Sequence, residues 1–324
     1  MYIAQAFKSL HEWWRYALGI VIVFIATQIG SIPFLGAAAF KVMQEGGSFD
    51  ELSDTNKLMT ILNPNLTLFL MLLSFAVGLG ALFLVIKFMH KQPIVEATTS
   101  RKKMDWGRFW FGFGMIGIFT LVLTGIDYYT NPESYIVQFQ LVPFLILAVI
   151  AIVLIPLQTS MEEYLFRGYL MQGIGVLAKN RWLPLILTSF TFGLLHLANP
   201  EVEKLGNIIM LYYIGTGFLL GIMTLMDEGM ELALGFHAGN NLIAAMLVTA
   251  DWTVFQTNSV LIDISEPTAG IDILFPVLIV YPIFLFIMAR KYKWNNWKEK
   301  LFGKVEKPSA ITTELPTTSF DKML

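Results

Sequence analysis

The sequence predicts an all-α, polytopic membrane protein with about eight transmembrane helices. Of its 324 residues, 56% are hydrophobic and 14% are charged, whereas soluble domains carry roughly 25% charged residues. The mean hydropathy of +0.63 also excludes disorder for most of the chain. A helix needs about 20 apolar residues to cross a bilayer. Eight stretches meet or approach this length, at residues 16–40, 66–88, 109–126, 141–157, 183–197, 208–226, 232–250 and 273–289.

Charged residues alternate in sign between successive connections. Basic residues gather before the first span, in the second and fourth connections and after the last span, at Lys8, Arg15, Lys87, Lys91, Arg101, Lys102, Lys103, Arg108, Lys179, Arg181, Arg290, Lys291, Lys293, Lys298 and Lys300. The other connections are acidic. Because cytoplasmic loops are rich in Lys and Arg, we expect both termini in the cytoplasm. The sixth connection is an exception, since it is acidic at Asp227, Glu228 and Glu231.

The chain contains no cysteine. This excludes disulfides, thiolate metal sites and cysteine nucleophiles. Any metal would need His, Asp, Glu or Asn as ligands. The net charge of -2 is close to balance, so no nucleic-acid partner is predicted.

The first candidate site motif combines Glu162, Glu163 and Arg167 within an apolar region. Ionisable groups are costly inside a membrane, so each is a functional hypothesis. On a helix, Glu163 and Arg167 are four residues apart and can form an ion pair, whereas Glu162 projects about 100° away from Glu163. The spacing predicts a structural Glu163 and leaves Glu162 for proton chemistry. The alternative is a charged patch at a helix end.

Two further motifs place histidines inside apolar spans. His196 stands alone in its segment, and His237 shares a helix face with Asn241. For His196, the alternative is a structural histidine that is hydrogen-bonded to a backbone carbonyl. For His237 and Asn241, the alternative is hydrogen bonding between helices. If Pro156 breaks the helix before Glu162, residues 162 and 196 lie at comparable depth on either side of a turn at 180–181. By the same residue counting, His237 is predicted to be shallower.

Together these motifs resemble those of the CPBP family, which comprises CAAX prenyl proteases and bacteriocin-processing intramembrane peptidases and is also called the Abi or type II CAAX protease family. The resemblance covers roughly residues 145–247. It rests on Glu-Glu-x-x-x-Arg at 162–167, on Phe-x-x-x-His from Phe192 to His196, and on His-x-x-x-Asn at 237–241. The resemblance implies an eight-helix core and hydrolysis of peptide bonds within or near the membrane.

The resemblance also implies a role for each motif residue. Glu162 would activate a water with help from His196, while His237 and Asn241 would stabilise the tetrahedral oxyanion. The family is described both as metalloproteases and as glutamate proteases, and a zinc ion held by Glu162, His196 and His237 is the alternative. A mechanism without metal is favoured here, because a zinc-bound Glu162 could not easily act as the base. The cofactor prediction is therefore none or zinc.

Four regions are expected along the chain: N-terminal transmembrane helices at 1–140, a CPBP-like catalytic core at 141–250, a last helix with an interfacial basic segment at 251–302, and a disordered tail at 303–324. The expected partners are the lipid bilayer and a membrane-associated protein or peptide substrate. The expected location is the inner membrane of a bacterial cell. Two other functions stay open, a proton-coupled transporter and a non-catalytic membrane adaptor.

Overall fold

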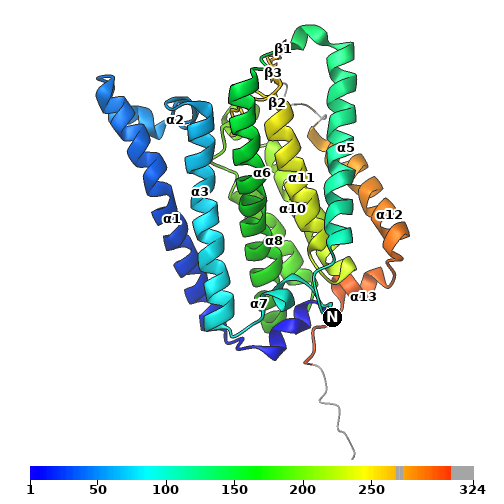
Figure 1. The fold of residues 1–324 in the computed structure, drawn as a ribbon. Coiled ribbons are helices and arrows are strands. Elements are labelled where there is room, and N and C mark those ends of the chain that lie inside the picture. The colour runs from blue at the N-terminus through cyan, green and yellow to red at the C-terminus, as the bar shows by residue number, and fades with distance from the viewer. Residues whose placement is uncertain (268–269, 271–272, 308–324) are drawn as a thin grey trace, which may run out of the picture.

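A computed structural model describes residues 1–267, 270 and 273–307, and it confirms the all-α membrane architecture (Figure 1). The described elements are η1 (Ile3–Lys8), α1 (Trp13–Gln44), η2 (Phe49–Ser53), α2 (Thr55–Thr60), α3 (Pro64–Leu84), η3 (Val85–Met89), α4 (Ile94–Thr98), α5 (Trp106–Thr130), η4 (Pro132–Ser134), β1 (Tyr135–Val137), α6 (Leu141–Glu163), η5 (Tyr164–Leu170), α7 (Met171–Ala178), α8 (Trp182–Leu194), α9 (Pro200–Leu205), α10 (Ile209–Asp227), α11 (Glu231–Leu247), β2 (Val248–Thr249), β3 (Leu261–Asp263), η7 (Pro276–Val280), α12 (Tyr281–Tyr292) and α13 (Trp297–Phe302).

Each of the eight predicted spans corresponds to helical structure. Among the described residues, five helices are long and apolar enough to cross a membrane: Trp13–Gln44, Pro64–Met89, Trp106–Thr130, Leu141–Ala178 and Ile209–Asp227. The remaining three predicted spans correspond to α8, α11 and the combination of η7 with α12. These three helices are shorter, and they complete the bundle around the longer ones.

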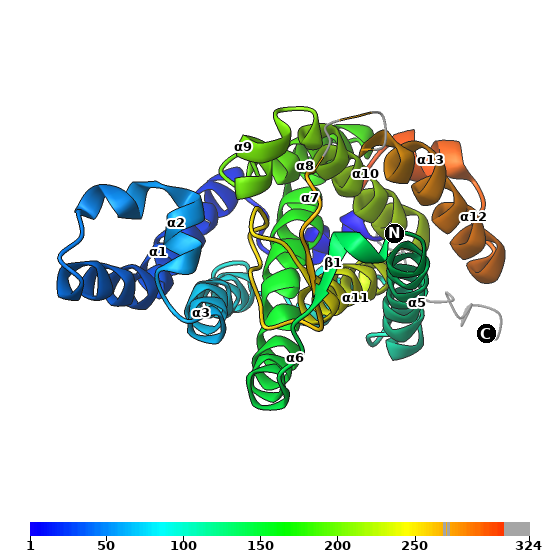
Figure 2. The same cartoon turned by 90° about the horizontal axis from the view of Figure 1, so that it is seen from above.

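Seen along the bundle, α6 lies near the centre (Figure 2). Helices α1 and α3 lie to one side of α6, and α5, α11 and α12 lie to the other. We call the end of the bundle that carries the Lys- and Arg-rich connections the basic end, and the opposite end the acidic end. Exposed Trp13, Trp106 and Trp182 lie at or near the starts of α1, α5 and α8 at the basic end, as is typical of a membrane interface. At the acidic end, β3 pairs antiparallel with β1 and parallel with β2.

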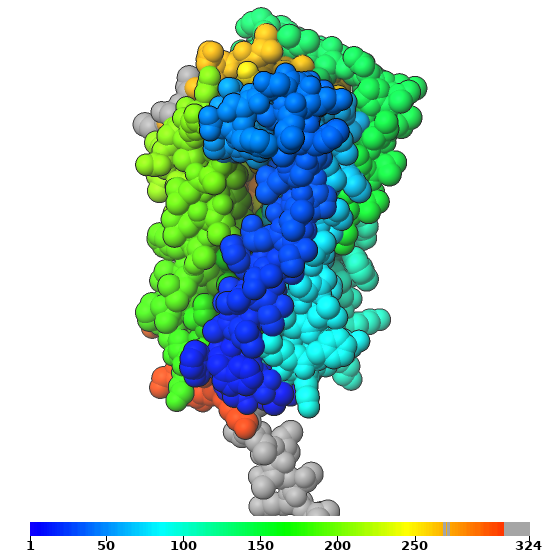
Figure 3. All heavy atoms as spheres, turned by 90° about the vertical axis from the view of Figure 1, so that its left-hand side faces the viewer, coloured from blue at the N-terminus to red at the C-terminus, as the bar shows by residue number. Residues whose placement is uncertain are grey.

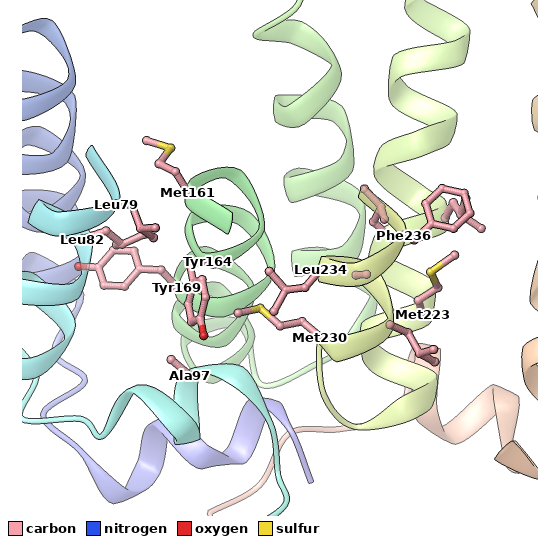
Figure 4. Close-up of a cluster of buried hydrophobic side chains, with 14 of the residues drawn as sticks. Leu79, Leu82, Ala97, Met161, Tyr164, Tyr169, Met223, Met230, Leu234 and Phe236 are labelled. Carbon is pink, nitrogen blue, oxygen red and sulfur yellow. The ribbon is translucent and has the colours of Figure 1, made fainter. Parts of the chain in front are cut away.

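The core lies between α3, α6, α10 and α11. Leu82, Tyr164, Met223 and Phe236 belong to one buried cluster that joins these helices through η5 (Figure 4). By contrast, α1 covers one face of the molecule beside α3, with α8 and α9 on its other side (Figure 3). Many of the large apolar side chains of α1 are exposed, as expected for a helix in contact with lipid.

Helix α11 is held against α5 at very short range. A Cβ atom at Gly239 would lie 2.7 Å from the carbonyl oxygen of Phe113, and one at Gly235 would overlap the carbonyl of Phe109. Only glycine allows the two backbones to approach this closely, as is common between membrane helices. Because α11 also carries His237 and Asn241, this contact fixes one wall of the candidate site.

The acidic sixth connection lies at the basic end, where two of its three carboxylates, Asp227 and Glu231, are paired with arginines of the second connection. Arg101 donates to Asp227 at 2.7 Å and to Glu231 at 3.1 Å, and Arg108 donates to Asp227 at 2.8 Å. The Asp227 carboxylate also accepts a hydrogen bond from the indole of Trp294 at 3.0 Å. The exception in the charge pattern is therefore a buried ionic cluster that ties the start of α11 to the loop before α5.

Pro156 does not break its helix, so the condition that the depth argument set, a break at this proline, is not met. Helix α6 runs through Pro156 and continues as η5 and α7 from Leu141 to Ala178, about 57 Å at 1.5 Å per residue. A proline permits a break without forcing one, because neighbouring groups in a packed membrane bundle can satisfy the freed backbone carbonyl. The irregular segment is instead the π-helical turn η5, which follows Glu163 directly.

The region after α13 differs from the predicted tail at its beginning. Val305 is buried in a cluster with Ile3, Met171 and Leu225, and its backbone N–H donates to the carbonyl of Lys179 at 3.0 Å. Residues 303–305 are therefore part of the packed structure. The remainder of the predicted disordered tail, residues 308–324, lies outside the described residues.

Candidate active site

Glu163 and Arg167 form the ion pair that their spacing predicts. Nη1 of Arg167 lies 3.0 Å from Oε1 of Glu163, and neither side chain is exposed. Nη2 of Arg167 donates to the carbonyl of Gly217 at 3.0 Å, and the guanidinium lies over the Phe192 ring, 4.6 Å from its centroid. The pair joins η5 to α8 and α10, which is a structural role.

His237 lies against both glutamates. Its Nδ1 is 2.8 Å from Oε1 of Glu163, and its Nε2 is 3.5 Å from Oε2 of Glu162. Because Arg167 already donates to Glu163, that oxygen is an acceptor and Nδ1 of His237 is the donor. The prediction of a shallower His237 was wrong. The depth of each residue was estimated from its distance in sequence to the nearest turn. This estimate fails because the α7–α8 and α10–α11 turns lie at different levels of the bundle (Figure 1).

Two carboxylates, Glu162 and Glu163, face Arg167 and His237 in this cluster. Nε2 of His237 is 3.5 Å from Oε2 of Glu162, and that oxygen is buried without a hydrogen-bond partner among the described residues. A buried, apolar environment favours carboxylates that lie close to basic or hydrogen-bond-donating groups.

Gln158 is a site residue that sequence reasoning missed. Its Nε2 donates to Oε1 of Glu162 at 2.6 Å, and its Oε1 accepts from Nδ2 of Asn241 at 3.2 Å. The amide therefore connects α6 to α11 and orients two of the predicted catalytic groups. The available signal was the four-residue spacing between Gln158 and Glu162, a polar pair in an apolar helix.

His196 lies on another wall of the site, beyond the Phe192 ring. Its Nδ1 donates to the carbonyl of Phe192 at 2.8 Å, which leaves Nε2 as an acceptor in the neutral imidazole. The ring stacks on Tyr213 with centroids 4.3 Å apart. The Phe192 ring is 4.9 Å from the His196 ring and 5.9 Å from the His237 ring, centroid to centroid. The aromatic residue of the Phe-x-x-x-His motif thus separates the two histidines.

A cavity of about 850 Å³ brings these groups together. Glu162, His196, His237 and Asn241 all line it, as does Gln158, while Glu163 and Arg167 lie behind its wall. Most of the remaining lining is apolar and comes from α1, α3, α5, α8, α10 and α12. A mainly apolar cavity with a few convergent polar groups is typical of a binding or active site.

The three predicted zinc ligands line one cavity but are not grouped as a metal centre in the part of the chain that the structure describes. Zinc needs three protein ligands around one point, and no group of three or more His, Asp or Glu residues that could hold a metal is found among these residues. Nδ1 of His237 is bonded to Glu163 and Oε1 of Glu162 to Gln158, which leaves the other nitrogen and oxygen of these two side chains free of those bonds.

Comparison with known proteins finds a family match over the region that carries these groups. The family model described as Type II CAAX prenyl endopeptidase Rce1-like matches residues 139–243. The "Uncharacterized protein YyaK" of Bacillus subtilis (strain 168) is 30% identical over 243 residues, which is 75% of this chain and 80% of that protein. The chain belongs to the CPBP family. The matched region of this CPBP protein contains all six predicted site residues, and the match supports a protease. No solved structure matches the chain.

Proposed function

We propose that the protein is an intramembrane endopeptidase that hydrolyses a peptide bond of a membrane-associated protein or peptide by a mechanism without metal. The observation that carries the proposal is the position of Glu162. Its carboxylate lines an apolar cavity and contacts Gln158 and His237, while Arg167 is neutralised separately by Glu163. An ionised carboxylate at a cavity wall is suited to act as a general base.

The first step is attack by water on the scissile carbonyl. Nε2 of His196 accepts one water proton as a hydrogen bond and orients the molecule, while Glu162 removes the other proton. The water oxygen bonds to the carbonyl carbon, and the carbonyl oxygen becomes an oxyanion. Nε2–H of protonated His237 and the second Nδ2–H of Asn241 donate to that oxyanion. Gln158 holds the amide of Asn241 and the carboxylate of Glu162 in place.

The second step breaks the carbon–nitrogen bond. Glu162 returns its proton to the leaving nitrogen, the tetrahedral intermediate collapses, and an amine and a carboxylic acid are released. Atoms and protons balance with water as the only co-reactant. Glu163 and Arg167 take no proton in this scheme; they hold His237 in orientation.

The test of this proposal is the appearance of new peptide termini in membranes. Membranes with the wild-type protein are compared with membranes that hold the same amount of the Glu162→Gln variant, and N-terminal peptides are identified by mass spectrometry. We expect a defined set of new termini within or next to apolar segments, present only with the wild type. Identical termini in both samples would contradict the proposal.

We also propose that the protein lies in a bacterial inner membrane with both termini in the cytoplasm. The chain has no cysteine, so single cysteines can be labelled without background. Lys103→Cys at the basic end and Ile264→Cys at the acidic end are both exposed positions. In intact cells we expect an impermeant maleimide to label only position 264. Labelling of both positions, or of position 103 alone, would overturn the orientation.

A further inference from the structure

One carboxylate in the cavity has no part in the proposed hydrolysis. Glu201 lies on α9, between α8 and α10, and lines the same cavity as His196 and Tyr213. Its Oε1 accepts a hydrogen bond from the backbone N–H of Val254 at 2.9 Å. Its Oε2 is buried and has no hydrogen-bond partner. Burial also raises the pKa of the Glu201 carboxyl, an effect that a positively charged partner would oppose.

The cavity offers no lysine or arginine to match this carboxylate. None of the residues that line it is Lys or Arg, and the described residues contain no ion pair to Glu201. The other lining carboxylate, Glu162, is already close to His237. His196 acts on Glu201 electrostatically, but its Nδ1 is bonded to the Phe192 carbonyl and it makes no ion pair with Glu201. Among the described residues, Glu201 is therefore the carboxylate of the cavity wall that lacks an ion-pair partner.

A buried oxygen without a partner is costly for a protein to maintain. A ligand that supplies the missing donor recovers that cost, and a cation does so with a charge-assisted hydrogen bond. The apolar lining accommodates an aliphatic or aromatic segment, and the carboxylate accommodates one positive group next to it. A free terminal carboxylate would instead meet two acidic side chains.

We infer that Glu201 forms a specificity subsite for a basic side chain of the substrate, a lysine or arginine that lies within an otherwise apolar segment. This inference deepens the proposed endopeptidase function and rests on it. Glu201 binds substrate away from the reacting atoms, so it selects the peptide and takes no part in proton transfer. It follows that the substrate segment in the cavity is internal to its chain.

The experiment measures binding separately from cleavage. The probes are two dansylated 12-residue peptides of Leu and Ala, acetylated and amidated, with either lysine or uncharged norleucine at the centre. Their dissociation constants are measured by fluorescence anisotropy with the full chain in detergent, in the Glu162→Gln background so that turnover does not interfere. We expect the lysine peptide to bind about tenfold more tightly, the effect of roughly 1.4 kcal/mol.

The added Glu201→Gln change should bring the ratio of the two dissociation constants close to one, because Gln keeps the acceptor for Val254 but loses the charge. Glu201→Lys should reverse the preference, so that the norleucine peptide binds more tightly than the lysine peptide. The matched control is Glu203→Gln, on the same helix but exposed and bonded to Asn56, which should keep the tenfold ratio. A ratio that persists in Glu201→Gln would overturn the subsite.

Cleavage by the wild type is then scored on the same two peptides. Cleavage of both peptides without a binding preference would overturn the subsite and support the endopeptidase. A lysine preference that depends on Glu201, without any cleavage by the wild type of either these peptides or membrane proteins, would support the subsite and overturn the endopeptidase.

Discussion

Glu162→Gln is expected to lower the turnover number by about 10³-fold while leaving the protein folded. The amide cannot remove a proton from water, and general base catalysis contributes roughly 10²–10⁴-fold. Stability should change little, because Gln still accepts the hydrogen bond from Gln158. The measurements are peptide turnover and the melting temperature of the purified protein in the same detergent.

The control for this prediction is Gln158→Leu, which keeps the base but removes the amide that orients it. We expect Gln158→Leu to retain partial activity with a changed pH profile, whereas Glu162→Gln has no pH optimum to measure. Turnover by Glu162→Gln close to that of the wild type would reject Glu162 as the base.

Glu163→Gln is expected to destabilise the protein by about 3–5 kcal/mol, the usual cost of removing one partner from a buried ion pair. Arg167 would keep its charge with neither side chain in contact with water, and only an uncharged amide oxygen would remain to accept from Arg167 and His237. The free energy of unfolding, measured by denaturant titration in mixed micelles, should fall by this amount. Activity per folded molecule should fall less than in Glu162→Gln.

A double variant separates the ion pair from simple packing. Glu163→Gln combined with Arg167→Met removes both charges together, so it should be less destabilised than the sum of the two single variants. Strict additivity would show that the two side chains are not coupled. Unchanged unfolding of Glu163→Gln would contradict the structural role.

Much of the fold could be predicted from the sequence because hydropathy alone determines which stretches enter a bilayer. The Glu163–Arg167 pair was also predictable, since both residues lie on one helix and their spacing fixes their geometry. The contact of His237 with the two glutamates could not be predicted, because it depends on how far α11 is displaced along α6. Local spacing carries no information on that displacement.

Gln158 and Glu201 show the same limit in two different ways. Gln158 becomes a site residue only when Asn241, 83 residues away in sequence, is placed beside it. Glu201 belongs to a connection that sequence reasoning treated as an ordinary acidic loop, and only the fold of α9 against Val254 brings it into the cavity. Polar residues that act through partners on other helices can therefore be recognised only once the tertiary structure is known.

The glycine contact between α5 and α11 has a consequence for how a bulky peptide can enter. Since the two backbones touch at Gly235 and Gly239, neither helix can slide or rotate without a steric clash, and the pair should behave as a single rigid body. His237 and Asn241 would then keep their positions while the opposite wall of the cavity moves. Helix α1, which packs beside α3 and exposes most of its apolar surface (Figure 3), is the wall that we expect to move outward into the lipid.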